Sequence, residues 1–220
     1  MKWFNCYTYF LTEAKTNGPS VTLPQGRKRM RKLDDASWDQ DQTNRRFCRY
    51  VLNEDSDGLK ATVRAMDRLG CWHSAVDQLK SGSSPNVAKG RALLSFWNDY
   101  GLVSIPSGLK EDLPHLIDAF RYLLPPYAGR GLRLYRGELE SRHATGVYGI
   151  SWTPIFEKAK QLADRRRHIE GPGVVLGIQA TPDLIVVAVR DHSEHTLTLG
   201  EDEYTVDPRR LHGSVSVVSR

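Results

Sequence analysis

The sequence contains few of the residues that hold small folds together covalently or through a metal. Its 220 residues include only three cysteines, Cys6, Cys48 and Cys71, and no CxxC or Cys/His ligand spacing. An odd number of widely separated cysteines predicts neither a disulfide framework nor a zinc site. We therefore expect a chain that folds around its own hydrophobic core in a reducing, cytoplasmic compartment.

Long hydrophobic runs are also missing. The most apolar stretch near the start, residues 3–11, contains Asn5 and Thr8 and is followed by Glu13 and Lys15. This stretch is too short and too polar to cross a bilayer, and no small-residue cleavage site follows it. The sequence therefore predicts neither a membrane anchor nor a signal peptide.

Glycine-rich nucleotide motifs are absent as well. No GxGxxG or GxxxxGK stretch occurs, which disfavours a Rossmann or P-loop nucleotide site. No repeats or low-complexity tracts are present either. The remaining composition, 40% hydrophobic and 26% charged, is ordinary for a globular protein.

The charge balance is basic, with a net charge of +5 and a pI of about 9.1. Much of the excess lies in one run, residues 27–32, and four aspartates between residues 34 and 41 follow it closely. A basic excess permits association with polyanions but specifies none. We favour a solvated, flexible segment for this run, with a nucleic-acid contact as the alternative.

Helical periodicity dominates residues 46–128, after a polar and partly flexible N-terminal arm over residues 1–45. Leu59, Val63 and Met66 recur at i, i+4 and i+7, and Gly70 follows them as a left-handed cap. Further helices are expected over 72–79, over 88–100 with Gly101 as the cap, and over 113–124, which Pro125-Pro126 stops. This helical region either completes the fold or recognises a target.

The period changes to that of short strands in the last part of the chain, residues 129–220. One helix interrupts the strands, and Thr153 is its expected N-cap with Pro154 at the first helical position. Strands broken by a single helix predict an α+β sheet domain. The β-prone runs are 132–136, 147–151, 173–180, 184–190, 203–206 and 214–219.

Three stretches in this β-rich region carry side chains suited to chemistry at a sugar. Arginine offers a rigid fork for phosphate or ribose oxygens, and serine and threonine hydroxyls orient carboxylates. A carboxylate stabilises positive charge at an anomeric carbon, and alternation in an extended segment points Glu201 and Glu203 to the same side. The stretches are Leu134-Tyr135-Arg136-Gly137, Gly149-Ile150-Ser151-Trp152-Thr153-Pro154, and residues 200–208, Gly-Glu-Asp-Glu-Tyr-Thr-Val-Asp-Pro.

In this order the stretches resemble the Arg, Ser-x-Thr/Ser, Glu-x-Glu clade of mono-ADP-ribosyltransferases, which includes cholera-toxin-like and arginine-specific enzymes. The resemblance covers residues 130–210. The chain resembles especially the bacterial and phage-encoded members that carry a Ser-Trp-Thr version of the middle motif. It implies a split β-sheet core behind a helical layer. It also implies that NAD is the substrate, that ADP-ribose moves to a macromolecular acceptor, that nicotinamide is released, and that no metal takes part.

The resemblance implies a set of residues that bind NAD. Arg136 would hold the nicotinamide ribose or the phosphates, with Gly137 beside it. Thr153 would support the wall of the site, and Tyr135 or Tyr148 could stack on nicotinamide. Packing within the strands is the alternative role for both tyrosines.

The resemblance also implies catalytic roles. Ser151 would orient Glu203, which would stabilise the positive charge that develops as nicotinamide leaves. Glu201 would position or deprotonate the acceptor. A glutamate at this first position is the arginine-modifying pattern of the family, whereas glutamine accompanies transfer to guanine bases. Trp152 departs from the commoner Ser-Thr-Ser motif.

The resemblance favours a toxin, an effector or a phage-encoded modifier. We expect it to act in the cytoplasm of the producing or a host bacterial cell. Its macromolecular acceptor is expected to be a protein, with a nucleic acid as the alternative. A neutralising antitoxin or immunity protein is an expected kind of partner, and a membrane is not. Two alternatives remain open. One is an NAD glycohydrolase, and the other is a non-catalytic protein that binds nucleic acid through its basic run.

Two further clusters attract attention but are better explained without a site. His192 and His195 lie near Asp191 and Glu194, yet no third ligand stands at a convincing spacing, so we expect a loop and no metal. Residues 165–168, Arg-Arg-Arg-His, end the expected helix, where positive charge suits the helix dipole.

Overall fold

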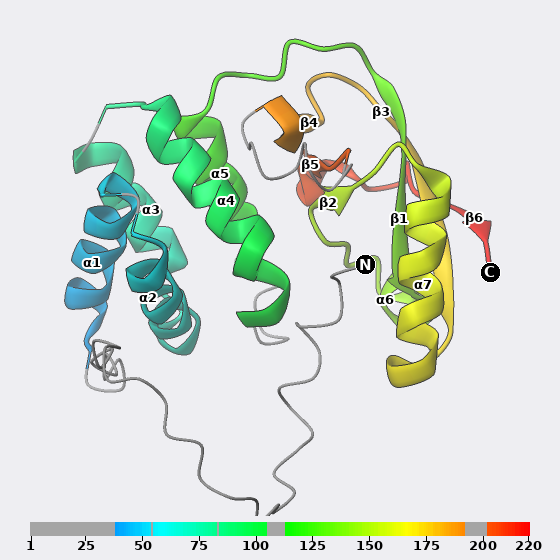
Figure 1. The fold of residues 1–220 in the computed structure, drawn as a ribbon, viewed down its shortest axis with the longest axis horizontal. Coiled ribbons are helices and arrows are strands. Elements are labelled where there is room, and N and C mark those ends of the chain that lie inside the picture. The colour runs from blue at the N-terminus through cyan, green and yellow to red at the C-terminus, as the bar shows by residue number, and fades with distance from the viewer. Residues whose placement is uncertain (1–37, 54, 83, 105–112, 192–201) are drawn as a thin grey trace, which may run out of the picture.

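The computed structural model describes residues 38–220 apart from residues 54, 83, 105–112 and 192–201. Helices fill the first half of this part of the chain and strands dominate the second, which confirms the predicted α+β class (Figure 1). The first half contains α1 (Gln40–Leu52), α2 (Ser56–Leu69), α3 (Trp72–Gly82), α4 (Val87–Ser104) and α5 (Leu113–Leu123). The second half contains β1 (Leu132–Leu139), α6 (Glu140–Ala144), β2 (Ser151–Trp152), α7 (Phe156–Glu170), β3 (Gly173–Ala180), β4 (Ile185–Ala188), η4 (Val189–Asp191), β5 (Tyr204–Val206), η5 (Pro208–Arg210) and β6 (Ser216–Ser219).

The first helix begins at Gln40, ahead of the boundary at residue 46 that the sequence favours. Asp39 is its N-cap, and its carboxylate accepts a hydrogen bond from the Gln42 amide at 2.7 Å. Thr43 and Asn44 are buried in this first turn. The helix start is polar although one side of it faces the core, so hydrophobic periodicity alone does not detect it.

Two glycine caps were expected, and the structure contains one of them. Gly70 ends α2 with a left-handed φ of 60°, as predicted. The prediction that Gly101 ends α4 is wrong, because α4 continues to Ser104. A glycine inside a helix costs only about 1 kcal/mol relative to alanine, which is too little to end a helix on its own.

The strands form two three-stranded antiparallel sheets. Sheet A has the order β1-β3-β6, and β1 pairs with β3 along its whole length, from Leu132 opposite Ala180 to Leu139 opposite Gly173. Sheet B has the order β2-β5-β4. A single bridge between Tyr135 and Thr153 connects sheet A to the end of β2.

The region between β1 and α7 differs most from the sequence expectation. Of the predicted strand 147–151 only Ser151 is in β2, which continues to Trp152, and the additional helix α6 precedes it. Thr153 is not the N-cap of α7, because the helix starts at Phe156 with Ile155 as its cap. The main chain of Thr153 instead pairs with Tyr135, and its hydroxyl accepts a hydrogen bond from the Ile155 amide at 3.2 Å.

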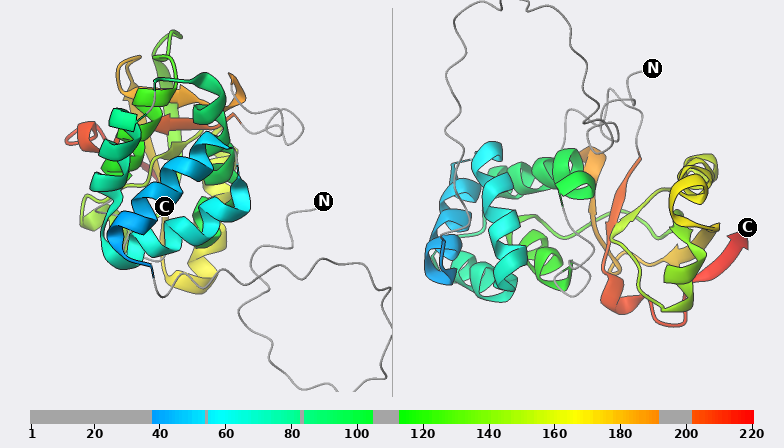
Figure 2. Two further views of the ribbon diagram at one scale, coloured as in Figure 1. Left: turned by 90° about the vertical axis from the view of Figure 1, so that its left-hand side faces the viewer. Right: turned by 90° about the horizontal axis from the view of Figure 1, so that it is seen from below.

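The elements stack in four layers, which are helices α1–α5, sheet B, sheet A and α7 (Figures 1 and 2). One core joins the first two layers, since Ile150, Val186 and Val187 pack with the buried side chains of the helices. A second core fills the space between the sheets, with Leu176 from sheet A and Tyr204 from sheet B. The helical region and the β-rich region therefore share one continuous interior.

The fourth layer, α7, lies on the other face of sheet A. Val175 packs with Ala159 and Ala163 of this helix, whereas its neighbours Val174 and Leu176 face sheet B. A side-chain carbon at Gly137 would meet the Ala159 carbonyl oxygen. Glycine at this position lets α7 lie directly on β1.

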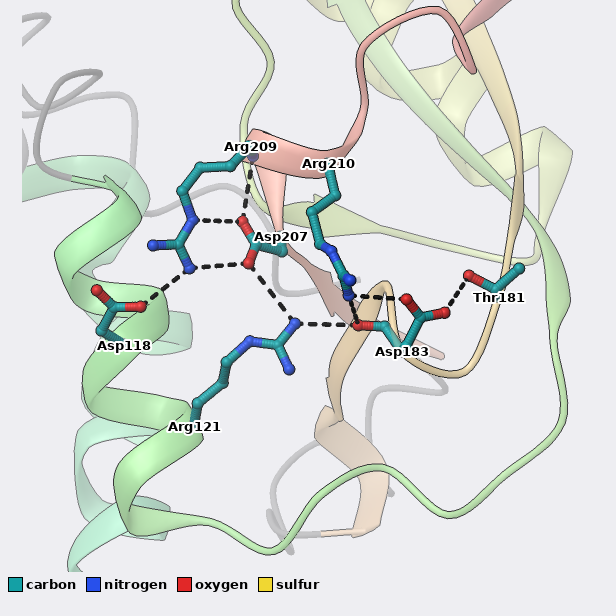
Figure 3. Close-up of polar contacts among 7 residues, drawn as sticks. All are labelled: Asp118, Arg121, Thr181, Asp183, Asp207, Arg209 and Arg210. Carbon is teal, nitrogen blue, oxygen red and sulfur yellow. Dashed lines mark hydrogen bonds and ion pairs between the residues drawn. The ribbon is translucent and has the colours of Figure 1, made fainter.

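A polar network joins α5 to the ends of β4 and β5 (Figure 3). Asp207 is only 2% exposed, and its two carboxylate oxygens accept hydrogen bonds from Arg209 at 2.9 and 2.8 Å. Arg209 also reaches Asp118 of α5 at 2.9 Å, and Arg121 of α5 lies 3.6 Å from Asp207. Burial by itself would raise the pKa of Asp207, but the hydrogen bonds and charge of Arg209, with the charge of Arg121, lower it below the ordinary value.

We predict that Asp207→Asn lowers the free energy of unfolding by about 2–3 kcal/mol at neutral pH, because Arg209 and Arg121 both lose the buried carboxylate with which they pair. The lowered pKa sets the pH dependence: the stabilisation is present above the ordinary carboxyl pKa of about 4 and is lost as the pH falls through the lowered value. Urea unfolding as a function of pH measures both effects. The control Asp183→Asn alters an exposed ion pair with Arg210 and should change stability much less. Equal losses in the two variants would contradict the role of Asp207.

Candidate functional site

The first two motifs meet where β1 lies beside β2. Tyr135 and Thr153 exchange two main-chain hydrogen bonds, of 2.7 and 2.9 Å. The next residue of β1, Arg136, extends its side chain to the same segment, where Nη1 donates to the Ser151 carbonyl oxygen at 2.8 Å. The arginine of the first motif is thus held against the serine of the second.

The third motif joins on the other edge of β2. Ser151 pairs with Thr205, and Trp152 pairs with Tyr204. Glu203 stands directly before β5, which begins at Tyr204. The Glu203 carbonyl oxygen accepts a hydrogen bond from the Val189 amide at 2.9 Å, which ties the main chain of Glu203 to the end of β4.

The three stretches therefore converge in the described structure, although 68 positions separate Arg136 from Tyr204 in the numbering. Residues directly opposite each other in an antiparallel pair point to the same face, and residues two apart on one strand do likewise. Ser151 and Thr205 accordingly share one face of sheet B. Glu201 lies outside the described residues, so its predicted role stays a prediction.

Arg136 is fixed by a carboxylate that the sequence analysis did not single out. Its Nε donates to Glu138 Oε2 at 2.9 Å, and the arginine side chain is 11% exposed whereas that of Glu138 is fully buried. The other oxygen of Glu138 accepts a hydrogen bond from the Leu139 amide at 3.0 Å and lies 3.7 Å from Arg142 Nη1. The signal for this pair was the i, i+2 spacing of Arg136 and Glu138, which puts both on one face of a strand.

Gly149 leaves space for the same guanidinium. A side-chain carbon at this position would overlap Nη2 and Cζ of Arg136 well inside van der Waals contact. The glycine at the start of the second motif therefore has a steric role. It leaves room for the charged end of Arg136 beside the Ser151 segment.

The tyrosines of the predicted NAD site lie on different sides of β1. The ring of Tyr135 packs edge-on against Phe156 of α7, 5.4 Å between centroids, on the face that also carries Gly137. Packing against α7 accounts for both of these residues. Tyr148 packs instead against the core between the two sheets, where burial and, to a smaller extent, the negative charge of Glu138 raise its pKa.

Tyr148 also has a polar partner. Its hydroxyl is 3.1 Å from His143 Nδ1, and the two rings lie 6.0 Å apart. Of the two tyrosines proposed from sequence, Tyr148 is the better placed to contact a ligand bound at Arg136.

The remaining candidates contribute no second site. In the described part of the chain no group of three His, Cys, Asp or Glu side chains could hold a metal ion, while His192, Glu194 and His195 lie outside it. No helix among the described residues is long and apolar enough to span a membrane. Cys48 and Cys71 are free thiols, and burial raises the pKa of Cys48 to about 11, so that thiol stays protonated at neutral pH. Cys6 and the basic run 27–32 also lie outside the described residues.

Comparisons with known proteins add no assignment. No protein-family model matches the chain, and neither the curated proteins nor the solved structures gave a match. The resemblance to ADP-ribosyltransferases therefore stays a prediction that depends on the three motifs.

We predict that Glu138→Gln lowers the free energy of unfolding by about 3 kcal/mol, because Arg136 keeps a buried charge and loses its anion. Chemical denaturation monitored by tryptophan fluorescence measures the change. The control is Glu140→Gln, which removes a carboxylate two residues further on that is 43% exposed and pairs with Arg220. Its stability should stay within about 1 kcal/mol of the wild type. A Glu138 variant as stable as the wild type would show that the pair does not hold Arg136.

Proposed function

We propose that this protein is an NAD-dependent mono-ADP-ribosyltransferase that moves ADP-ribose to a macromolecular acceptor and releases nicotinamide. The observation that supports it most strongly is the placement of one short segment, residues 150–153. This segment contacts Arg136 on one side and pairs with the strand after Glu203 on the other. This placement supports the proposal that the three motifs, weak separately, supply the cation, the hydroxyl and the carboxylate of one site.

The residues present fit the needs of such a dinucleotide. A guanidinium held by Glu138 is oriented before the ligand arrives, so little conformational entropy is lost when phosphate or ribose oxygens bind. The absence of a side chain at Gly149 makes room for this guanidinium. The two small antiparallel sheets with helices on both outer faces are compatible with the split-sheet core that the motifs imply.

NAD supplies an activated sugar, in which the bond from the ribose carbon to nicotinamide breaks with both electrons on the nicotinamide nitrogen. Glu203 places a negative charge near the carbon where positive charge develops, and Ser151 orients that carboxylate. The acceptor forms the new bond to this carbon and loses one proton, for which Glu201 is the proposed base. The glutamate at position 201 favours an arginine side chain as the acceptor.

We predict that Glu203→Gln lowers the rate of nicotinamide release at least about a hundredfold, equivalent to about 2.7 kcal/mol of transition-state stabilisation. The substitution keeps the shape of the side chain and removes its charge. Nicotinamide release is measured with NAD and a mixture of protein and arginine-analogue acceptors. The control Asp202→Asn removes the neighbouring carboxylate, which alternation points away from Glu203, and should retain most of the activity.

The same assay, run with and without acceptors, distinguishes a transferase from an NAD glycohydrolase. Release that depends on Glu203 but leaves no label on any acceptor, with or without arginine analogues, would assign an NAD glycohydrolase. Loss of activity in Asp202→Asn equal to that in Glu203→Gln would contradict the assignment of Glu203.

Gly149→Ala tests the role of Arg136 without removing the arginine. The added methyl group would push the guanidinium away from the buried Glu138 carboxylate, so we expect a loss of stability similar to that of Glu138→Gln. At a temperature where the variant stays folded, we predict a rise of about tenfold or more in the NAD concentration that gives half-maximal nicotinamide release. An unchanged NAD dependence would mean that Arg136 does not contact the substrate.

A further inference from the structure

The outward face of α1 carries a row of cations that the proposed function does not use. Gln42, Arg45, Arg46 and Arg49 stand at i, i+3, i+4 and i+7, so all four lie on one side of the helix. They line a hollow of about 270 Å³. The opposite side of α1, with Phe47 and Val51, is buried in the helical layer.

Aromatic rings hold two of the three guanidinium groups. The Arg46 guanidinium lies 4.2 Å above the ring of Trp38. That of Arg49 lies 4.8 Å from the ring centre of Tyr50 and donates a hydrogen bond to its hydroxyl at 3.0 Å. A guanidinium held in this way loses less conformational entropy when it binds an anion.

No carboxylate neutralises this row in the part of the chain that the structure describes. None of the three arginines forms an ion pair with a described residue, although Asp41 stands four residues before Arg45. Asp39, just before the helix, accepts a hydrogen bond from the Gln42 amide as the helix cap. Three positive charges within five residues therefore face outward together, and such an array favours a polyanion.

We infer that this face of α1, defined by Gln42, Arg45, Arg46 and Arg49, is a docking surface for the phosphate backbone of a double-stranded nucleic acid. Guanidinium groups match phosphate geometry, and a straight row of them suits the regular phosphates of a duplex. The helix lies on the outer side of the helical layer, on the side of the molecule away from β1 and β2 (Figures 1 and 2). A bound duplex would therefore leave the candidate site free.

The surroundings of the row argue against other polyanions. Trp38 and Tyr50 are 7% and 8% exposed, so they offer no platform on which the bases of a single strand could stack. Phe47, Tyr50 and Val51 of α1 are buried in the core. Leu52 at the end of the helix is 37% exposed, and one such side chain makes no apolar face that could insert into a membrane. The sequence supplies five more cations in the run 27–32, close before this helix.

The test is fluorescence anisotropy of a short labelled duplex DNA with the full-length protein, at several salt concentrations and without NAD. We expect the triple variant Arg45→Gln, Arg46→Gln, Arg49→Gln to bind at least about tenfold more weakly, and the slope of log K against log salt to fall in magnitude by about 2–3. The matched control neutralises three exposed arginines elsewhere, Arg64, Arg91 and Arg130, and removes the same charge. Its binding should change little.

A single variant, Arg45→Gln, guards against effects on folding. Arg45 has no hydrogen bond, ion pair or ring contact with a described residue, so weaker DNA binding by this variant would reflect the loss of a phosphate contact. Four results would overturn the inference. The wild type does not bind DNA, or the control triple variant binds DNA as weakly as the α1 variant. Alternatively, DNA binding depends on the run 27–32 alone, or the protein binds polyglutamate or anionic lipid vesicles more tightly than DNA. All of these results are independent of NAD cleavage.

Discussion

The arrangement of the candidate site depends on the main-chain hydrogen bonds of one short segment, residues 150–153. On one edge this segment exchanges two bonds with Tyr135, and on the other it pairs with β5 from Tyr204 to Val206. The segment thus joins sheet A to sheet B through the main chain. The relative positions of Arg136 and Glu203 are therefore set by backbone geometry, which is stiffer than side-chain contact.

Two buried carboxylates stabilise the strands on either side of this segment. Glu138 binds Arg136 within β1, and Asp207 binds Arg209 just after β5. A buried ion pair gains little net stability over apolar packing, but breaking it by removing one partner is costly. Such pairs specify a position more than they stabilise a fold. In this protein they fix a cation on one side of the site and, through Asp118 and Arg121, connect the helical layer to the strand that follows Glu203.

Hydrophobic period and turn residues allowed the α+β class, the helices α2 to α5 and most strands to be predicted. Gly70, for example, was predicted to cap α2, and it ends the helix in the left-handed conformation that glycine favours. The start of α1 was missed because buried Thr43 and Asn44 are polar. The predicted strand 147–151 began too early, because residues 147–149 are β-prone in sequence but lie outside β2. Local propensity does not reveal which segment will find a partner strand.

The candidate site could also be predicted only in part from the sequence. The motif order predicts roles for Arg136, Ser151 and Glu203, and the strand pairing brings their segments together. Glu138 was not foreseen because a carboxylate in a strand is usually solvated, and its burial becomes evident only when β1 lies between α7 and sheet B. Tyr135 and Gly137 belong to the first motif, yet alternation along β1 turns them toward α7.

The central claim is that this site breaks the bond between nicotinamide and ribose and keeps the rest of NAD for an acceptor. The most direct measurement follows the two halves of NAD separately, with one label in the adenine and another in the nicotinamide, after incubation of the wild-type protein with a bacterial lysate. We predict that the adenine label becomes attached to macromolecules while the nicotinamide label is released in equal amount. If both labels remain together in intact NAD, the assignment of an ADP-ribosyltransferase is wrong.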